Sequence, residues 1–95
     1  MIIIAGWLRV APDDRDRYLA ATEAVARLAR RTPGCHDFVQ AADPIEPGRI
    51  NVYERWESDG ALAGFRDTDG PAMADLPPLQ GADVHKYRIS GVESP

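Results

Sequence analysis

The sequence predicts an α+β fold in a single domain. Three observations carry this prediction: an apolar, β-branched run at the start, an amphipathic helical pattern after it, and two alternating segments joined by a Pro- and Gly-rich turn. A chain of 95 residues is long enough for one hydrophobic core and too short for two. We therefore expect one domain over residues 1–95.

The composition excludes several kinds of partner. Eleven basic and fifteen acidic residues give a net charge of −4 without any run of Lys or Arg, so no nucleic-acid partner is expected. The longest apolar stretch, residues 1–8, is far too short to cross a bilayer, so we expect no membrane partner and a cytoplasmic location. With one cysteine, Cys35, and two histidines that have no acidic cluster nearby, neither an internal disulfide nor a metal site is expected.

The first strand and the first helix follow from two different periodicities. Residues 2–10 are apolar on both faces except at Arg9, which is typical of a central strand with cover on each side. Pro12 and the aspartates after it favour a helix start. The apolar residues from Tyr18 to Ala29 then fall on one side of a helix of about five turns, which the sequence Thr-Pro-Gly at 32–34 ends.

The middle of the chain is predicted to form a hairpin. Residues 35–42 and 49–57 have strand character, and the segment between them is rich in proline and glycine. Alternation along the second strand sorts its side chains onto two faces. One face carries Ile50, Val52, Glu54 and Trp56, and the other carries Asn51, Tyr53, Arg55 and Glu57.

A second helix and a last strand complete the chain. Ser58 is a good N-cap, and Leu62 and Phe65 have the spacing of a short amphipathic helix. A further turn or two of helix is expected between residues 71 and 76. The last strand is predicted over residues 82–92, so the full order of elements is β-α-β-β-α-β.

This order is the ferredoxin-like pattern, whose usual product is a four-stranded antiparallel sheet with both helices on one face. The other face would carry Ile3, Ala5, Trp7 and Tyr53. A patch of several hundred Å² of this kind is more than a monomer usually exposes. We therefore expect a homodimer in which two copies pack through the open sheet face.

Several short segments together resemble a known family. They are Thr32-Pro33-Gly34-Cys35, Phe38, Asp43-Pro44, Glu54-Arg55-Trp56-Glu57-Ser58 and Ala61-Leu62. In this combination the chain resembles the antibiotic biosynthesis monooxygenase (ABM) domain family. The resemblance implies a dimeric α+β barrel with a pocket between helices and sheet in each subunit. It also implies oxidation of a small phenol, quinol or anthrone-like aromatic substrate by molecular oxygen, without metal or flavin.

The chain departs from the family pattern at specific positions. Phe65 stands where members often have a histidine, three residues after the Ala-Leu pair. Heme-degrading relatives use an asparagine on the first strand and a histidine beyond the second helix. Gly6 and Asp75 stand near those places here, although Trp56 matches the relatives' tryptophan. Heme degradation is therefore disfavoured, and we expect no cofactor.

The candidate site lies on the helix-facing side of the sheet. Trp56 is a candidate aromatic wall for a planar substrate. Glu54, a carboxylate among apolar groups, is a candidate general base with a raised pKa. Its alternative role is a structural ion pair with an arginine of the long helix or of a partner subunit. The residues expected to bind substrate are Ile4, Gly6, Leu8, Val52, Trp56, Leu62, Phe65 and Met73.

Two other functions stay open at this point. The chain is compatible with a non-catalytic dimer that binds a small ligand or has a structural role on the same scaffold. It is also compatible with a non-oxidative enzyme, a cyclase or isomerase that acts by proton transfer. A fold shared with monooxygenases does not decide among these functions.

Overall fold

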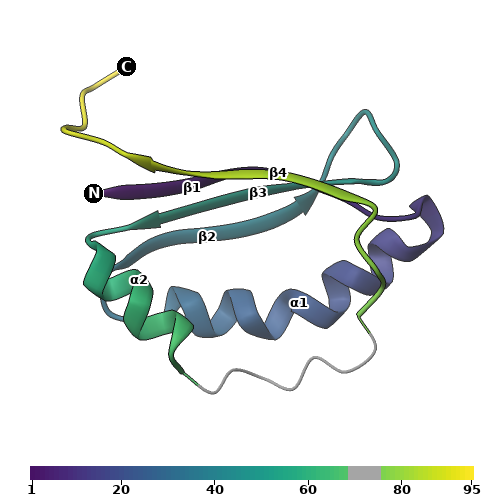
Figure 1. Ribbon diagram of the computed structural model, residues 1–95, viewed down its shortest axis with the longest axis horizontal. Coiled ribbons are helices and arrows are strands. Elements are labelled where there is room, and N and C mark those ends of the chain that lie inside the picture. Colours follow the sequence, from purple (N-terminus) through teal and green to yellow (C-terminus); the bar gives the residue numbers. More distant parts are fainter. Residues whose placement is uncertain (69–75) are drawn as a thin grey trace.

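The computed structural model describes residues 1–68 and 76–95. The elements follow the predicted β-α-β-β-α-β order, with a short 3₁₀ turn before the first helix (Figure 1). They are β1 (Ile2–Arg9), η1 (Pro12–Asp14), α1 (Arg15–Arg30), β2 (Cys35–Ala42), β3 (Arg49–Trp56), α2 (Asp59–Arg66) and β4 (Gly81–Arg88).

The four strands form one antiparallel sheet in the order β2-β3-β1-β4. The first strand is central, as its apolar run predicts. Both helices lie on one side of the sheet, and the opposite side is uncovered in the single chain (Figure 1). The predicted α+β, ferredoxin-like fold is therefore confirmed.

Strand register decides which side chains face the helices. On β1, Ile2 lies opposite Trp56, and Ile4 lies opposite Glu54. Because side chains alternate along a strand, the even-numbered residues of β1 and β3 point toward the helices. Ile3, Ala5, Trp7 and Tyr53 point to the open side, as the sequence predicts.

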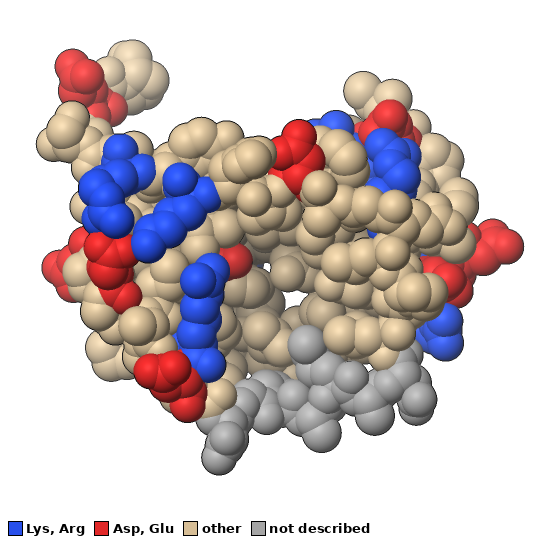
Figure 2. All heavy atoms as spheres, in the orientation of Figure 1, with Lys and Arg blue, Asp and Glu red and all other residues tan. Residues whose placement is uncertain are grey.

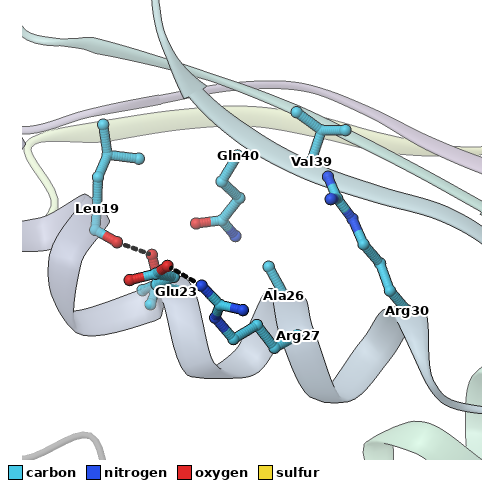
Figure 3. A pocket seen from close by; sticks show the side chains of 8 residues that line it. Leu19, Glu23, Ala26, Arg27, Arg30, Val39 and Gln40 are labelled. Atoms are coloured by element: carbon cyan, nitrogen blue, oxygen red, sulfur yellow. Dashed lines mark hydrogen bonds and ion pairs between the residues drawn. The ribbon is translucent and has the colours of Figure 1, made fainter.

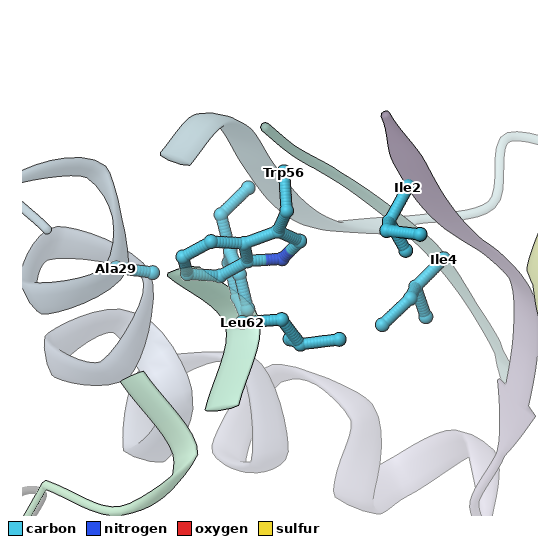
Figure 4. Close-up of a cluster of buried hydrophobic side chains, with 6 residues drawn as sticks. Ile2, Ile4, Ala29, Trp56 and Leu62 are labelled. Atoms are coloured by element: carbon cyan, nitrogen blue, oxygen red, sulfur yellow. The ribbon is translucent and has the colours of Figure 1, made fainter. Parts of the chain in front are cut away.

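The core on the helix side has two clusters. The larger one joins the sheet to both helices through Ile2, Ile4, Ala29, Phe38, Trp56 and Leu62 (Figure 4). Trp56 is its largest member and is fully buried. The smaller cluster, Val10, Tyr18 and Ile50, lies toward the other end of the sheet.

Two glycines occupy positions where the side chain of any other residue would collide with neighbouring atoms. Gly6 has φ +152°, and a Cβ there would collide with the carbonyl of Asp83, so the pairing of β1 with β4 requires glycine. Gly34 has φ +86°, and a Cβ there would press on the side chain of Ala61 in α2. Gly34 thus lets the first turn of α2 sit close to the start of β2.

The structure corrects some predicted boundaries. Pro12–Asp14 form the 3₁₀ turn, and α1 proper begins at Arg15. The last strand does not reach residue 92: it ends at Arg88, which pairs with Ile2 at the start of β1, and one further backbone hydrogen bond follows, from the N–H of Ile89 to the carbonyl of Met1 at 3.1 Å. The helical turn expected at 71–76 falls almost wholly outside the described residues. Within the described part of the chain, no helix has the length and apolar character needed to cross a membrane.

Candidate functional site

Glu54 is a carboxylate placed among apolar side chains on the helix-facing side of β3. Its Oε1 accepts a hydrogen bond of 3.0 Å from the indole Nε1 of Trp56. Burial raises the pKa of Glu54, while the Trp56 hydrogen bond and the positive charge of Arg66 act to lower it. Burial is the largest of these effects, so Glu54 is a stronger base than an ordinary glutamate.

Three aromatic rings pack together next to this acid. The ring centroids of Trp56 and Phe65 are 5.2 Å apart, and those of Phe38 and Phe65 are 6.0 Å apart in an edge-to-face arrangement. Trp56 and Phe38 are buried, whereas Phe65 is only partly buried. Of the three rings, Phe65 is therefore the one that is partly exposed to solvent. Trp56 packs against Phe65 and donates the hydrogen bond that orients Glu54.

The local sequence explains how α2 presents Phe65. The Oγ of Ser58 accepts a hydrogen bond of 3.1 Å from the backbone N–H of Ala61, which caps the helix. From this start, Leu62 and Phe65 fall three residues apart and so share the face turned to the sheet. Arg66 follows Phe65 at the last position of α2.

A cavity of about 310 Å³ opens between α2 and β4. Leu62 forms part of its wall and also belongs to the buried cluster around Trp56, so the cavity borders the aromatic group. The remaining lining residues are Asp59, Ala63, Arg66, Asp67 and Lys86. Figure 2 shows basic and acidic side chains close together on the left of the molecule, the side on which Figure 1 places α2.

A second cavity, of about 280 Å³, lies between α1 and β2 and is separate from these residues (Figure 3). Its charged side chains already have partners: Arg27 binds Glu23 at 2.7 Å, and the Nε of Arg30 donates to the carbonyl of Phe38 at 2.9 Å. The buried Oε1 of Gln40 accepts no hydrogen bond from the described residues. None of the sequence-predicted site residues lines this cavity.

The structure brings most of the sequence-predicted residues together. Ile4, Trp56, Leu62 and Phe65 are in one packed cluster. Val52 lies two residues before Glu54 on the same face of β3 and pairs with Gly6. These residues therefore surround the acid or lie next to it on one surface.

Other predicted positions lie elsewhere. Leu8 packs with Val10, Tyr18 and Ile50 in the smaller cluster, so it lies away from Trp56. Met73 is outside the described residues. The alternative role of Glu54, an ion pair with an arginine of the long helix, is not seen among the described residues. Arg30, at the end of α1, instead contacts the carbonyl of Phe38 at 2.9 Å and the carboxylate of Asp37 at 3.7 Å.

Sequence reasoning missed Arg66 and Lys86. Lys86 pairs with Ile4 and so lies on the helix-facing side of β4. Alternation along the last strand already separates Lys86 and Arg88 from His85 and Tyr87, which is the signal that was available. Only the fold, however, places Lys86 beside Arg66 around one cavity.

The fold and this site define a class of protein: a ferredoxin-like α+β domain with a partly buried carboxylate beside aromatic rings on the helix side of its sheet. Residues 1–72 match the family model described as antibiotic biosynthesis monooxygenase. The chain therefore belongs to the antibiotic biosynthesis monooxygenase (ABM) family.

Solved structures agree with this assignment at the level of the fold. A protein of Deinococcus radiodurans, provisionally described as an antibiotic biosynthesis monooxygenase, has a TM-score of 0.81 at 17% identity, over 99% of this chain and 97% of that one. A protein of Nitrosomonas europaea with the same provisional description has a TM-score of 0.80 at 19% identity, over 98% and 100% of the two chains. At these identities the likeness shows the fold alone.

A curated relative matches more locally. The uncharacterized protein sll1783 of Synechocystis is 28% identical over 61 residues, which is 64% of this chain and 42% of that protein. This chain therefore corresponds to less than half of the length of that relative.

Proposed function

We propose that this protein is a cofactor-independent monooxygenase that oxidises a small phenol, quinol or anthrone-like substrate with molecular oxygen, and that Glu54 is its general base. The observation that carries the proposal is the environment of Glu54: a carboxylate that accepts a hydrogen bond from Trp56, whose ring packs against the partly exposed ring of Phe65, and whose pKa is raised by burial. Family membership supports the oxygenase class.

The chemistry needs only a base and a dry aromatic pocket. Glu54 removes a proton from the phenol or from the activated methylene group, and the resulting anion is electron-rich enough to reduce oxygen directly. For a methylene substrate, one oxygen atom becomes the new carbonyl oxygen and the other leaves as water with the two methylene hydrogens. The substrate supplies all four electrons that the oxygen molecule accepts, so the balance requires no external reductant.

We also propose that two copies associate through the open sheet face. Ile3, Ala5, Trp7 and Tyr53 lie on this face and are only partly covered in one chain. On the same face, the buried Nε of Arg55 has no hydrogen-bond partner among the described residues. A second copy would cover the apolar groups and offers acceptors to Arg55. Replacement of Trp7 by Glu should convert a dimer into a monomer in sedimentation experiments, and a wild-type monomer would contradict this proposal.

The oxygenase proposal is tested by oxygen uptake with a panel of hydroquinones and anthrones. Glu54→Gln keeps an acceptor for the Trp56 N–H but removes the base, so turnover should fall by about 10²- to 10⁴-fold. Glu57→Gln is the matched control, because Glu57 is exposed and lies just beyond β3, and it should leave the rate unchanged.

Each alternative function gives a different result in the same experiment. Uptake no faster than the substrate's own autoxidation, or a Glu54→Gln variant as fast as wild type, would overturn the proposal. Product formation under nitrogen would point to proton transfer without oxidation. Tight binding of an aromatic ligand without turnover would point to a binding protein.

A further inference from the structure

The connection between β2 and β3, residues 43–48, carries the most exposed large apolar side chain of the described part of the chain. Ile45 is 85% exposed, compared with 66% for Val92, which is next in order. This connection, the hairpin tip, rises above the sheet on the side away from the helices (Figure 1). The segment that carries Ile45 therefore projects toward the side on which we propose that a second copy packs.

The hairpin tip is held in place by several contacts although it is exposed. The carboxylate of Asp43 accepts a hydrogen bond of 3.0 Å from the backbone N–H of Ile45, and Nη1 of Arg15 donates to the carbonyl of Glu46 at 2.9 Å. A proline precedes Ile45 and another follows Glu46, and each fixes its own φ. A segment that is ordered before binding loses little conformational entropy on docking. An apolar side chain on such a segment is well suited to bind a partner.

Two further exposed apolar side chains lie at the opposite end of the open sheet face. Tyr87 is 50% exposed and pairs with Ile3, so it points to the open side. Val92 belongs to residues 89–95, which follow β4 and also rise on the side away from the helices, at the other end of the sheet from the hairpin tip (Figure 1). The open side thus has an exposed apolar group at each end of the sheet.

The flat part of the open face is small for a stable dimer. Four strands of eight residues, at about 4.8 Å between strands and about 3.4 Å per residue, have an outline of about 19 by 27 Å, or about 500 Å². A standard interface buries about 800 Å² on each partner. A stable dimer through this face therefore needs contacts beyond the strands, and the hairpin tip and residues 89–95 are segments that project on the required side (Figure 1).

With aligned strands, two-fold symmetry allows two ways of stacking the open faces. An axis parallel to the strands sets the hairpin tip over the partner's hairpin end, where Arg9 and Arg49 occupy the open side. An axis perpendicular to the strands sets it over the partner's other end, which carries Tyr87 and Val92. The second arrangement covers the exposed apolar groups of both ends with one another, and symmetry makes the contact twice.

We propose that the hairpin tip is an arm of the dimer, and that Ile45 packs against the partner's Tyr87 and Val92 at the far end of the partner's open face. The inference rests on the proposed association of two copies through this face. It adds which end of the partner each tip meets and which side chain makes the contact.

Sedimentation of Ile45→Ser over a range of dilutions tests the contact. Each dimer loses two apolar contacts, so the dimer dissociation constant should rise by at least about 10-fold. Leu79→Ser is the matched control. Leu79 is 49% exposed, but residues 76–80 lie on the helix side of the sheet, so this variant should dimerise like wild type (Figure 1).

Disulfide trapping in a Cys35→Ser background decides which ends meet. Ile45→Cys combined with Tyr87→Cys should give a covalent dimer on oxidation. Within one chain these positions lie at opposite ends of the sheet, more than about 20 Å apart, so the bond forms only between copies. Ile45→Cys alone should stay uncrosslinked, because the two tips lie at opposite ends of the dimer.

The outcomes separate this inference from the proposals on which it rests. An Ile45→Ser protein that dimerises as tightly as wild type, a paired-cysteine variant that does not crosslink, or a crosslink through Ile45→Cys alone would overturn the inference and leave the dimer standing. A wild-type monomer would overturn both. The role of Glu54 is measured by oxygen uptake and stands or falls separately.

Discussion

Two carboxylates at opposite ends of the β2–β3 hairpin have opposite environments. Asp43, in the connection between the strands, accepts backbone hydrogen bonds from Glu46 at 2.8 Å and Ile45 at 3.0 Å and a side-chain bond of 2.9 Å from Asn51. These donors, led by the backbone N–H of Glu46, lower the pKa of Asp43 to about 2. Glu54 has one donor, the Trp56 indole, and burial raises its pKa.

The difference shows how one chemical group is held by several donors in one place and left in a more apolar setting, with a raised pKa, in another. In the connection between β2 and β3, the backbone carbonyls around Asp43 also have a donor. Nη1 of Arg15 lies within hydrogen-bond distance of the carbonyl oxygens of Asp43, Glu46 and Arg49. A carboxylate held by several donors resists protonation and fixes a turn. A carboxylate with one donor in an apolar setting is the one that is ready to accept a proton.

Trp56 gives the largest test of this contrast, since it both fills the core and donates to Glu54. Trp56→Ala should lower the free energy of unfolding by about 3–5 kcal/mol in denaturant titrations, because the indole is fully buried. Trp56→Phe should cost less, because it keeps most of the ring volume.

The same two variants should move the pKa of Glu54 in opposite directions. Trp56→Phe removes the hydrogen bond that lowers the pKa of Glu54, while the phenyl ring still keeps water away from the carboxylate. The pH at which kcat/KM reaches half of its plateau should therefore rise. Trp56→Ala admits water, and because burial is the main cause of the raised pKa, that midpoint should fall toward an ordinary glutamate. Midpoints that move together in the two variants would show that Glu54 does not control the profile.

Arg15 supplies the second largest test, at the hairpin end. Arg15→Met removes the charged donor of three close contacts to carbonyls and should cost about 2 kcal/mol of stability, within the range for hydrogen bonds to charged groups. Oxygen uptake at a temperature where the variant is folded should be unchanged. A loss of turnover in the folded variant would mean that the Asp43 end of the β2–β3 hairpin affects the chemistry at the Glu54 end.

Ser58 tests the support of α2 on a smaller scale. Ser58→Ala removes the cap of a helix of eight residues and should cost about 1 kcal/mol. Hydrogen exchange should show faster exchange of the Ala61 amide, which donates to Ser58 Oγ. Ser90→Ala, in the exposed tail after β4, should change neither measurement.

The sequence predicted which face each strand residue occupies, because alternation is a local property. Ile4, Glu54 and Trp56 were placed correctly on the helix side for this reason. Alternation does not say how far along a face a residue lies, so Leu8 was grouped with Ile4 although it packs at the other end.

The remaining features depend on contacts between distant parts of the chain. The last strand ends at Arg88, opposite Ile2 at the start of β1, and this limit depends on the pairing of distant segments, which no local pattern records. The cations Arg66 and Lys86 are 20 positions apart in sequence and meet only because α2 and β4 enclose one cavity. The environment of Glu54 was predictable as apolar, but its single donor, Trp56, depends on side-chain orientation.

The smallest expected effects are changes of stability with pH, and they should have opposite signs for the two carboxylates. The pKa of Asp43 is lower in the folded protein than in the unfolded chain, so Asp43 adds stability above about pH 4 that is lost as the pH falls toward 2. Asp43→Asn should therefore lower the melting temperature at neutral pH and lose this effect in acid.

The pKa of Glu54 is higher in the folded protein than in the unfolded chain, so its ionisation reduces stability as the pH rises from the unfolded value through the folded one. Glu54→Gln should consequently raise the melting temperature at about pH 7, with little gain at about pH 4, in the variant expected to have lost turnover. Scanning calorimetry of the two variants at both pH values checks these signs. A Glu54→Gln protein that is less stable than wild type at neutral pH would mean that the charge of Glu54 is satisfied in the folded state, and that the acid is as structural as Asp43.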